Sequence, residues 1–165
     1  MKTEILENLT IRVNWHGPYG LDEVCDSNMG NGLYLLTGKR RYERNEQIQY
    51  CGITEGLYKN RFKQHHKIFE ITRELGVWIG TVAYPQEHKR THLEIAESII
   101  VYFWQPNLNE RKRIYPPRPT ALLSHWFRKD GSPRFNQLSI YADLHDVICW
   151  DGEFWRSGNL RVWSD

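Results

Sequence analysis

Two apolar stretches decide the fold of this chain: Gly32-Leu33-Tyr34-Leu35-Leu36-Thr37 and Gln47-Ile48-Gln49-Tyr50-Cys51-Gly52-Ile53. Both have the length and the apolar, aromatic composition of β-strands, and the charged residues 39–46 between them suit an exposed hairpin loop. Neighbouring residues of a strand point to opposite sides of a sheet. If Leu33 and Cys51 face the core, the two tyrosines therefore share the opposite face.

The sequence around this hairpin predicts both strands and helices. We expect the hairpin to be preceded by a strand over 9–14 and by a loop over 15–31 that is rich in Gly, Pro, Asn and Asp. The elements expected after it are a helix over 56–72, a strand over 76–84 and a helix over 91–104. Beyond a proline-rich linker, the tail predicts a short helix over 120–127, a segment at 137–141, and a hairpin of 147–150 with 154–156.

We therefore expect an α+β fold. Its centre is a small, mostly antiparallel sheet of about three core strands flanked by helices. An extra N-terminal strand and loop and a C-terminal β-rich extension complete it. The 165 residues suit one domain. Within it we distinguish an N-terminal extension (1–31), a core (32–113) and a C-terminal extension (114–165), which either joins the same domain or forms a small recognition or dimerisation subdomain.

Composition excludes several classes of protein. With 40% hydrophobic and 25% charged residues, the chain has the composition of an ordinary globular protein. No apolar stretch approaches the roughly 20 residues of a membrane span, and the first residues lack an export signal. Cys25, Cys51 and Cys149 have no paired spacing, which argues against a disulfide framework or a Cys-rich zinc site. We expect a cytoplasmic protein with reduced thiols and no membrane role.

Positive charge is concentrated although the net charge is only +2. One cluster, Lys39-Arg40-Arg41 with Arg44, lies between the tyrosine stretches, and a second, Arg111-Lys112-Arg113, follows the helix expected over 91–104. The tail interleaves basic residues with four tryptophans: Trp126, Trp150, Trp155 and Trp163. These tryptophans either stack on bases beside phosphate contacts or form the core of a small hairpin.

Both long predicted helices place polar side chains on or beside their apolar faces. On a helical wheel, Arg61 and His65 fall inside the apolar arc of the first helix, and Glu97 lies at the edge of the arc of the second. Glu94 lies on the polar side. A buried charge is costly unless it is paired or used. The alternatives are a core arginine bonded to backbone carbonyls beside a satisfied histidine, and an ordinary surface glutamate.

Residues 32–109 resemble the GIY-YIG endonuclease family. Its two name-giving tripeptides match Gly32-Leu33-Tyr34 and Tyr50-Cys51-Gly52, in which leucine and cysteine replace the usual isoleucines. Family members carry an arginine soon after the second tripeptide, often with a histidine one turn later, as Arg61 and His65 do. The metal-binding glutamate of the family is followed by proline after nine residues and by asparagine after twelve; the matching residues here are Glu97, Pro106 and Asn109.

The resemblance implies a DNA endonuclease that hydrolyses phosphodiester bonds at a single-metal site. Glu97 would hold Mg²⁺ or Mn²⁺ together with substrate oxygens and waters, and Arg61 would bind the scissile phosphate. Tyr34 is then the candidate general base, and Tyr50 would orient the attacking water or the phosphate. A tyrosine base acting near pH 7 needs its pKa lowered by about 3 units from its ordinary value near 10.

Two further roles follow from the same resemblance. His65 would hydrogen-bond a tyrosine and relay its proton, or would accept the proton itself. Asn109 would position the site.

Three functions remain open at this point. The first is a stand-alone DNA endonuclease, such as a restriction, mobile-element or repair enzyme. The second is a structure-specific repair or recombination nuclease that works with a partner subunit, and the third is a nucleic-acid-binding module without catalysis. DNA is the expected partner in each, and a homodimer is a further expectation for an enzyme that cuts both strands.

Overall fold

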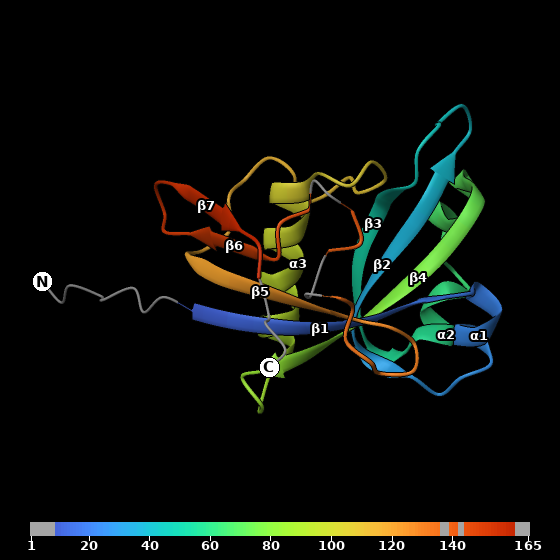
Figure 1. Cartoon of the computed structure of the whole chain (residues 1–165), viewed down its shortest axis with the longest axis horizontal. Coiled ribbons are helices and arrows are strands. Elements are labelled where there is room, and N and C mark those ends of the chain that lie inside the picture. Colours follow the sequence, from blue (N-terminus) through green and yellow to red (C-terminus); the bar gives the residue numbers. More distant parts are fainter. Residues whose placement is uncertain (1–8, 136–138, 142–143, 161–165) are drawn as a thin grey trace, which may run out of the picture.

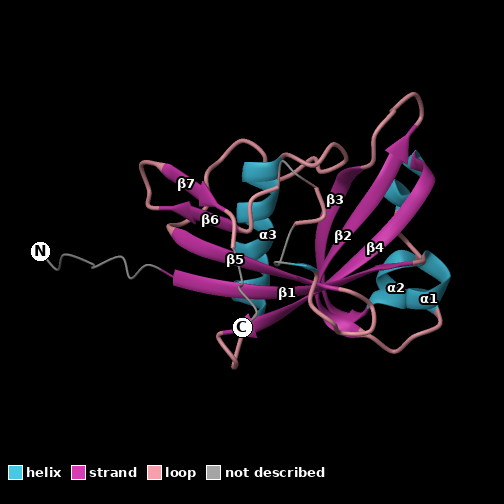
Figure 2. Cartoon of the chain, in the orientation of Figure 1, coloured by secondary structure: helices cyan, strands magenta, loops and turns pink. Residues whose placement is uncertain are grey.

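The structure is a computed structural model that describes residues 9–135, 139–141 and 144–160. Within these residues, seven strands form one sheet, together with three α-helices and one 3₁₀-helix (Figures 1 and 2). In chain order the elements are β1 (Leu9–Tyr19), α1 (Leu21–Cys25), β2 (Gly30–Arg40), β3 (Gln47–Leu57), α2 (Tyr58–Phe62), η1 (His66–Glu70), β4 (Ile71–Tyr84), α3 (Arg90–Trp104), β5 (Thr120–Phe127), β6 (Val147–Trp150) and β7 (Trp155–Gly158). The strand order across the sheet is β3-β2-β4-β1-β5-β6-β7.

This sheet corrects the expected fold class. We expected a small sheet of three core strands flanked by helices, whereas the described residues form a seven-stranded mixed sheet and are mostly β. β2 pairs antiparallel with β3 and β4, and β1 pairs antiparallel with β4 but parallel with β5. The N-terminal strand is therefore internal to the sheet. It joins the tyrosine hairpin to the C-terminal strands.

The sheet is strongly twisted. In Figure 1, β2, β3 and β4 run steeply across the view, whereas β1, β5, β6 and β7 lie nearly flat. Such a twist accumulates when each strand is rotated by roughly 20–25° relative to the next. α3 contacts β2, β3 and β5, whereas α1 contacts α2 and β4.

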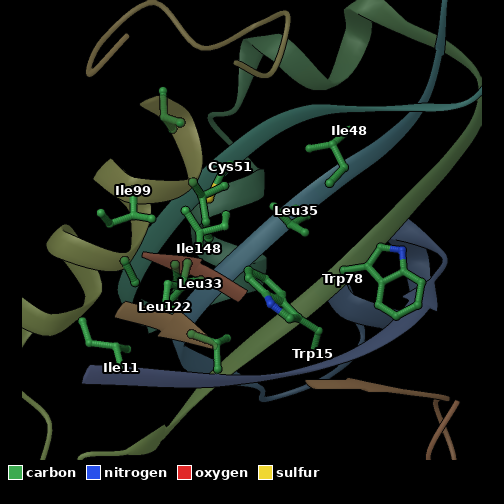
Figure 3. Packing of buried hydrophobic residues seen from close by; sticks show 14 of the residues in the cluster. Ile11, Trp15, Leu33, Leu35, Ile48, Cys51, Trp78, Ile99, Leu122 and Ile148 are labelled. Carbon is green, nitrogen blue, oxygen red and sulfur yellow. The ribbon is translucent and has the colours of Figure 1, made fainter. Parts of the chain in front are cut away.

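The two faces of the tyrosine hairpin belong to different hydrophobic clusters. Leu33, Leu35 and Cys51 pack with residues of α3 and of the C-terminal strands in the larger cluster (Figure 3). Tyr34 and Leu36 pack with buried residues of α1, α2 and η1. The expected separation of the tyrosines from the leucine and cysteine is confirmed. α3 therefore covers one face of the hairpin, and the short helices cover the other.

The helix predicted over residues 120–127 is wrong, because these residues form β5. Ala121, Leu122 and Leu123 favour a helix locally. Along the strand, however, every second side chain is buried, and Trp126 stacks on Trp15 of the parallel strand β1 with ring centroids 5.8 Å apart. Tertiary pairing therefore overrides the local helical preference here.

The continuous helix predicted over residues 56–72 is also wrong. α2 ends after Phe62, and the chain resumes as the 3₁₀-helix η1. Phe69, which a continuous helix would place on the apolar face, is 83% exposed. Its neighbour Ile68 is buried instead. The break changes the path by which His65 reaches the site.

Several other predictions are confirmed. Residues 76–84 lie within β4, residues 91–104 lie within α3, and β6 and β7 form the C-terminal hairpin. In the hairpin turn, Asp151 Oδ1 accepts hydrogen bonds from the backbone N–H groups of Glu153 and Phe154. The segment predicted at 137–141 lies partly outside the described residues. In the part of the chain that is described, the three cysteines are free and no helix has the length and apolar character needed to cross a membrane.

Candidate active site

A polar cleft of about 460 Å³ opens beside β3, which forms one edge of the sheet. Its lining comes from four places: β3, α2 with the segment after it, α3, and the loop that follows α3. Four of the six predicted site residues line it: Tyr50, Arg61, Glu97 and Asn109. The structure therefore gathers these four residues from distant parts of the sequence. The other two predicted residues, Tyr34 and His65, contact Tyr50 from within the protein.

The two tyrosines and the histidine form one aromatic group. The rings of Tyr34 and Tyr50 stack with centroids 6.0 Å apart and an interplanar angle of 25°. The ring of His65 meets Tyr50 edge-on at 4.6 Å and Tyr34 at 5.8 Å. Phe62 packs edge-on against Tyr34 at 4.9 Å. Tyr50 is the member of this group that lines the cleft, and Tyr34 and His65 pack against its ring from the protein interior.

Tyr34 is fully buried, and its hydroxyl has no hydrogen-bond partner among the described residues. In the β2–β3 ladder it lies opposite Gly52, which lines the cleft. A Cβ atom at position 52 would overlap both Cζ and Oη of Tyr34. The hydroxyl of Tyr34 therefore lies directly beneath this part of the cleft wall, separated from the cleft only by glycine.

Burial raises the pKa of both phenols. For Tyr34 the loss of solvation is the main cause, the neighbouring Tyr50 adds to it, and the charge of Arg61 opposes it. For Tyr50 the loss of solvation again dominates, and Arg61 opposes it through its charge and a hydrogen bond. Both shifts of pKa run opposite to the lowering that a tyrosine base acting near pH 7 requires.

His65 reaches the tyrosines by a path that the sequence did not predict. It precedes η1 in an extended conformation, with φ −92° and ψ 92°, rather than standing one helical turn beyond Arg61. Its side chain is buried, and its Nε2 has no hydrogen-bond partner in the described part of the chain. Burial, reinforced by the charge of Arg61, lowers the pKa of His65 to about 4. The imidazole is therefore neutral at pH 7 and able to accept a proton.

Glu97 carries the most enclosed carboxylate of the cleft. Its side chain is 14% exposed, and its Oε2 accepts a hydrogen bond from Lys112 Nζ at 2.5 Å. Glu94 also lines the cleft, although the helical wheel assigned it to the surface. That carboxylate is half exposed and pairs with Arg90, its Oε1 lying 2.8 Å from Arg90 Nε. The two glutamates thus differ in burial and in partner.

Asn109 binds the loop after α3 to the free edge of β3. Its Oδ1 accepts a hydrogen bond from the backbone N–H of Cys51, and its Nδ2 donates to the carbonyl of the same residue, both at 2.9 Å. The backbone N–H of Leu108 donates to the carbonyl of Gln49 at 2.8 Å. The asparagine side chain therefore continues the ladder as a neighbouring strand would. It positions the loop and does not present its amide to the cleft.

Arg61 differs from most of the cations around the cleft. Lys67, Arg90 and Lys112 each pair with a glutamate that also lines it. Among the described residues, Arg61 forms no ion pair with a carboxylate. Its charge is therefore not neutralised by a carboxylate, and a guanidinium has five N–H donors, so Arg61 can bind an anion such as a phosphate beside its hydrogen bond to Tyr50.

The carboxylates of the cleft could hold a hard divalent cation only together with waters or substrate oxygens. Within the described residues, no group of three or more His, Cys, Asp or Glu side chains could enclose a metal ion. Glu97, however, already accepts a cation, the ammonium of Lys112, and Glu94 lies on the same helix wall. Mg²⁺ commonly uses one or two carboxylates and completes its coordination with waters and substrate phosphates. Glu97, the more enclosed of the two carboxylates, is the group that would hold it.

Sequence reasoning missed the residues that connect the cleft walls. Lys112 was noticed only as part of a basic cluster, because fifteen residues separate it from Glu97 and no helical spacing relates the two. Lys67 and Glu110 pair across the cleft at 2.6 Å and gave no sequence signal. Comparison with known proteins found no matching family model, no matching curated protein and no matching solved structure.

Proposed function

We propose that this protein is a divalent-metal-dependent DNA endonuclease that hydrolyses phosphodiester bonds in the cleft beside β3. The observation that carries the proposal is the convergence of Tyr50, Arg61 and Glu97 on one cleft, supported from behind by Tyr34 and His65. The resemblance to GIY-YIG endonucleases concerns these same residues. The convergence is independent support, because the residues come from three separate elements.

Hydrolysis requires a water to attack phosphorus while the ester oxygen leaves, so the site must bind the phosphate and remove a proton from the water. Arg61 binds the non-bridging oxygens of the phosphate. Glu97 would hold the metal ion, which would supply positive charge against the phosphate and the leaving oxygen. Tyr50 lines the cleft and orients the water through its hydroxyl.

The proton acceptor that the electrostatics favour is His65. The pKa of both phenols is raised, so neither is ionised near pH 7, whereas His65, with a pKa of about 4, is already unprotonated there although the same shift makes it a weak base. Its ring contacts both tyrosines. We therefore assign His65 to take the proton that leaves the water by way of a tyrosine hydroxyl. This assignment replaces the expectation that a tyrosinate is the base.

The charge of the cleft and exposed rings elsewhere on the surface suit a nucleic acid. Five basic and three acidic side chains line the cleft, so the summed charge of its lining is positive. The loop after α3 continues from the basic residues into Ile114 and Tyr115, which are 78% and 83% exposed. At the tip of the β2–β3 hairpin, Arg41 lies over the exposed ring of Tyr42. Basic residues beside exposed rings can contact phosphates and stack on bases.

The test is a cleavage assay on duplex, branched and single-stranded DNA with Mg²⁺ or Mn²⁺. We expect cleavage that EDTA abolishes. Glu97→Gln should abolish it as well, because the enclosed carboxylate is lost, whereas the matched control Glu94→Gln, three residues away on the same helix, should retain most of it. Arg61→Ala should lose turnover while remaining folded by circular dichroism. Equal activity of Glu97→Gln and wild type would refute the metal assignment, and binding of DNA without cleavage by the wild type would indicate a binding module instead.

A further inference from the structure

Lys112 is the nearest partner of the proposed metal ligand. Its Nζ lies 2.5 Å from Glu97 Oε2, within the distance of a charge-assisted hydrogen bond. Glu97 is largely enclosed, so solvent screens this pair less than an ordinary surface pair. The ammonium therefore occupies one of the two carboxylate oxygens that a metal ion could use.

The backbone of the loop holds the lysine in an unfavourable conformation. Lys112 has φ 65°, in the left-handed region that residues with a side chain seldom adopt. Its neighbour Arg113 anchors the loop by donating from Nη1 to the carbonyls of Pro106 and Asn109. Asn109 in turn is bound to Cys51 on β3. The fixed loop thus delivers one ammonium group to Glu97 rather than leaving it in solvent.

A second lysine–glutamate pair on the same cleft provides a contrast. Lys67 Nζ lies 2.6 Å from Glu110 Oε1, but Glu110 is 77% exposed. Exposed pairs of this kind contribute little and break easily. The two pairs have nearly the same length and differ in the burial of the carboxylate. The Lys67 pair is therefore a matched control for the Lys112 pair.

We propose that Lys112 is an internal competitor of the metal ion at Glu97, and that the DNA backbone relieves the competition by taking the ammonium for itself. This inference rests on the proposed function and describes how metal binding at Glu97 is regulated. When a phosphate approaches the cleft, Lys112 exchanges a carboxylate oxygen for a phosphate oxygen, and Glu97 becomes available to the metal. Metal and DNA therefore bind cooperatively, and by linkage each tightens the other by the same factor.

The first experiment measures Mn²⁺ binding to the folded protein by electron paramagnetic resonance, with no DNA present. Lys112→Met keeps the length of the side chain and removes the charge, so Mn²⁺ should bind about three- to fivefold more tightly, the range expected for an ion pair of this kind. Lys112→Arg and Lys67→Met should both bind Mn²⁺ as the wild type does. An unchanged Mn²⁺ affinity in Lys112→Met would overturn the proposal.

The second experiment repeats the titration with a duplex whose linkages are all phosphorothioate, which keeps the backbone charge and resists cleavage. The duplex should tighten Mn²⁺ binding in the wild type, and most of this gain should vanish in Lys112→Met. The same gain in both proteins would overturn the coupling. Glu97→Gln separates the two levels of inference. If it weakens Mn²⁺ binding while Lys112→Met changes nothing, only the role of Lys112 fails; if it leaves Mn²⁺ binding intact, the proposed metal site fails as well.

Discussion

The ring of Tyr34 occupies the space that a side chain at position 52 would need. An added Cβ at Gly52 would overlap Cζ and Oη of Tyr34, and Tyr34 is fully buried among the rings of Tyr50, Phe62 and His65. The ring has no open space into which it can move. The glycine of the second tripeptide therefore fixes how closely one tyrosine approaches the cleft.

We expect Gly52→Ala to destabilise the protein by about 2 kcal/mol, a typical cost of overpacking a well-filled core. The same change should displace Tyr34 and lower cleavage. In the matched control Gly56→Ala, on the same strand, the atom nearest the added Cβ is Thr54 Oγ1 at 3.8 Å, an ordinary contact. Urea unfolding of both variants measures the difference. Equal stability of the two variants would show that Tyr34 moves aside at no cost.

Asn109→Ala should also lower stability, because it removes two hydrogen bonds to the backbone of the buried residue Cys51. Leaving buried backbone groups unpaired costs about 1–3 kcal/mol. Asn107→Ala is the control, since Asn107 bonds only to the side chains of Gln47 and Gln49 and is exposed. We expect less than about 1 kcal/mol for the control in urea unfolding. A larger loss in the control than in Asn109→Ala would contradict the assigned role.

The sequence predicted the tyrosine hairpin because its information is local. Alternation along two adjacent strands places Tyr34 opposite to Leu33 and Cys51, and one turn closes the pair. It could not predict that β1 would join β4 and β5, because a parallel pairing between residues more than one hundred positions apart leaves no local pattern. The fold class was wrong for this reason, and the helix predicted over 120–127 is the strand β5 that makes this parallel pairing.

In the candidate site, too, residues with a local sequence pattern were predicted and residues placed by the tertiary structure were not. Glu97 and Asn109 were found because a helix and a short loop separate them by a fixed number of residues. His65 was found by a spacing that assumed a continuous helix, yet the helix ends after Phe62 and His65 lies in the extended residue before η1. Lys112 was not assigned to the site, because its position depends on a loop conformation with positive φ that the lysine itself does not favour.

The stability of the protein should fall on mild acidification because of His65. Its pKa is about 4 in the folded protein and 6.5 ordinarily, so the unfolded chain binds the proton more readily between these values. The stability that the neutral imidazole of His65 contributes is fully present above pH 6.5 and is lost as the pH falls toward 4. At about 1.4 kcal/mol per unit of pKa, the loss reaches at most about 3 kcal/mol.

Urea unfolding between pH 7 and pH 4.5 measures this loss, with His65→Asn compared with wild type. The free energy of unfolding of the variant should depend less steeply on pH than that of the wild type. His66→Asn is the control, because His66 is exposed and should leave the wild-type slope unchanged. Identical slopes for His65→Asn and wild type would show that the imidazole is not held neutral by the fold.

The pH dependence of cleavage distinguishes the two candidate bases. If His65 accepts the proton, its pKa of about 4 predicts a rate that rises between pH 3 and about pH 5 and is then level through neutral pH. If a tyrosinate were the base, the rate would instead keep rising tenfold per pH unit through the alkaline range, because burial raises the pKa of Tyr34 and Tyr50. We expect the first profile for the wild type, measured as kcat/KM on a duplex that the protein cuts.

His65→Asn should lose about 10²-fold or more in rate, the usual contribution of a proton acceptor, and its remaining activity should follow the second profile. Tyr50→Phe should lower the rate as well, because it removes the hydroxyl that orients the water and lies between the cleft and His65.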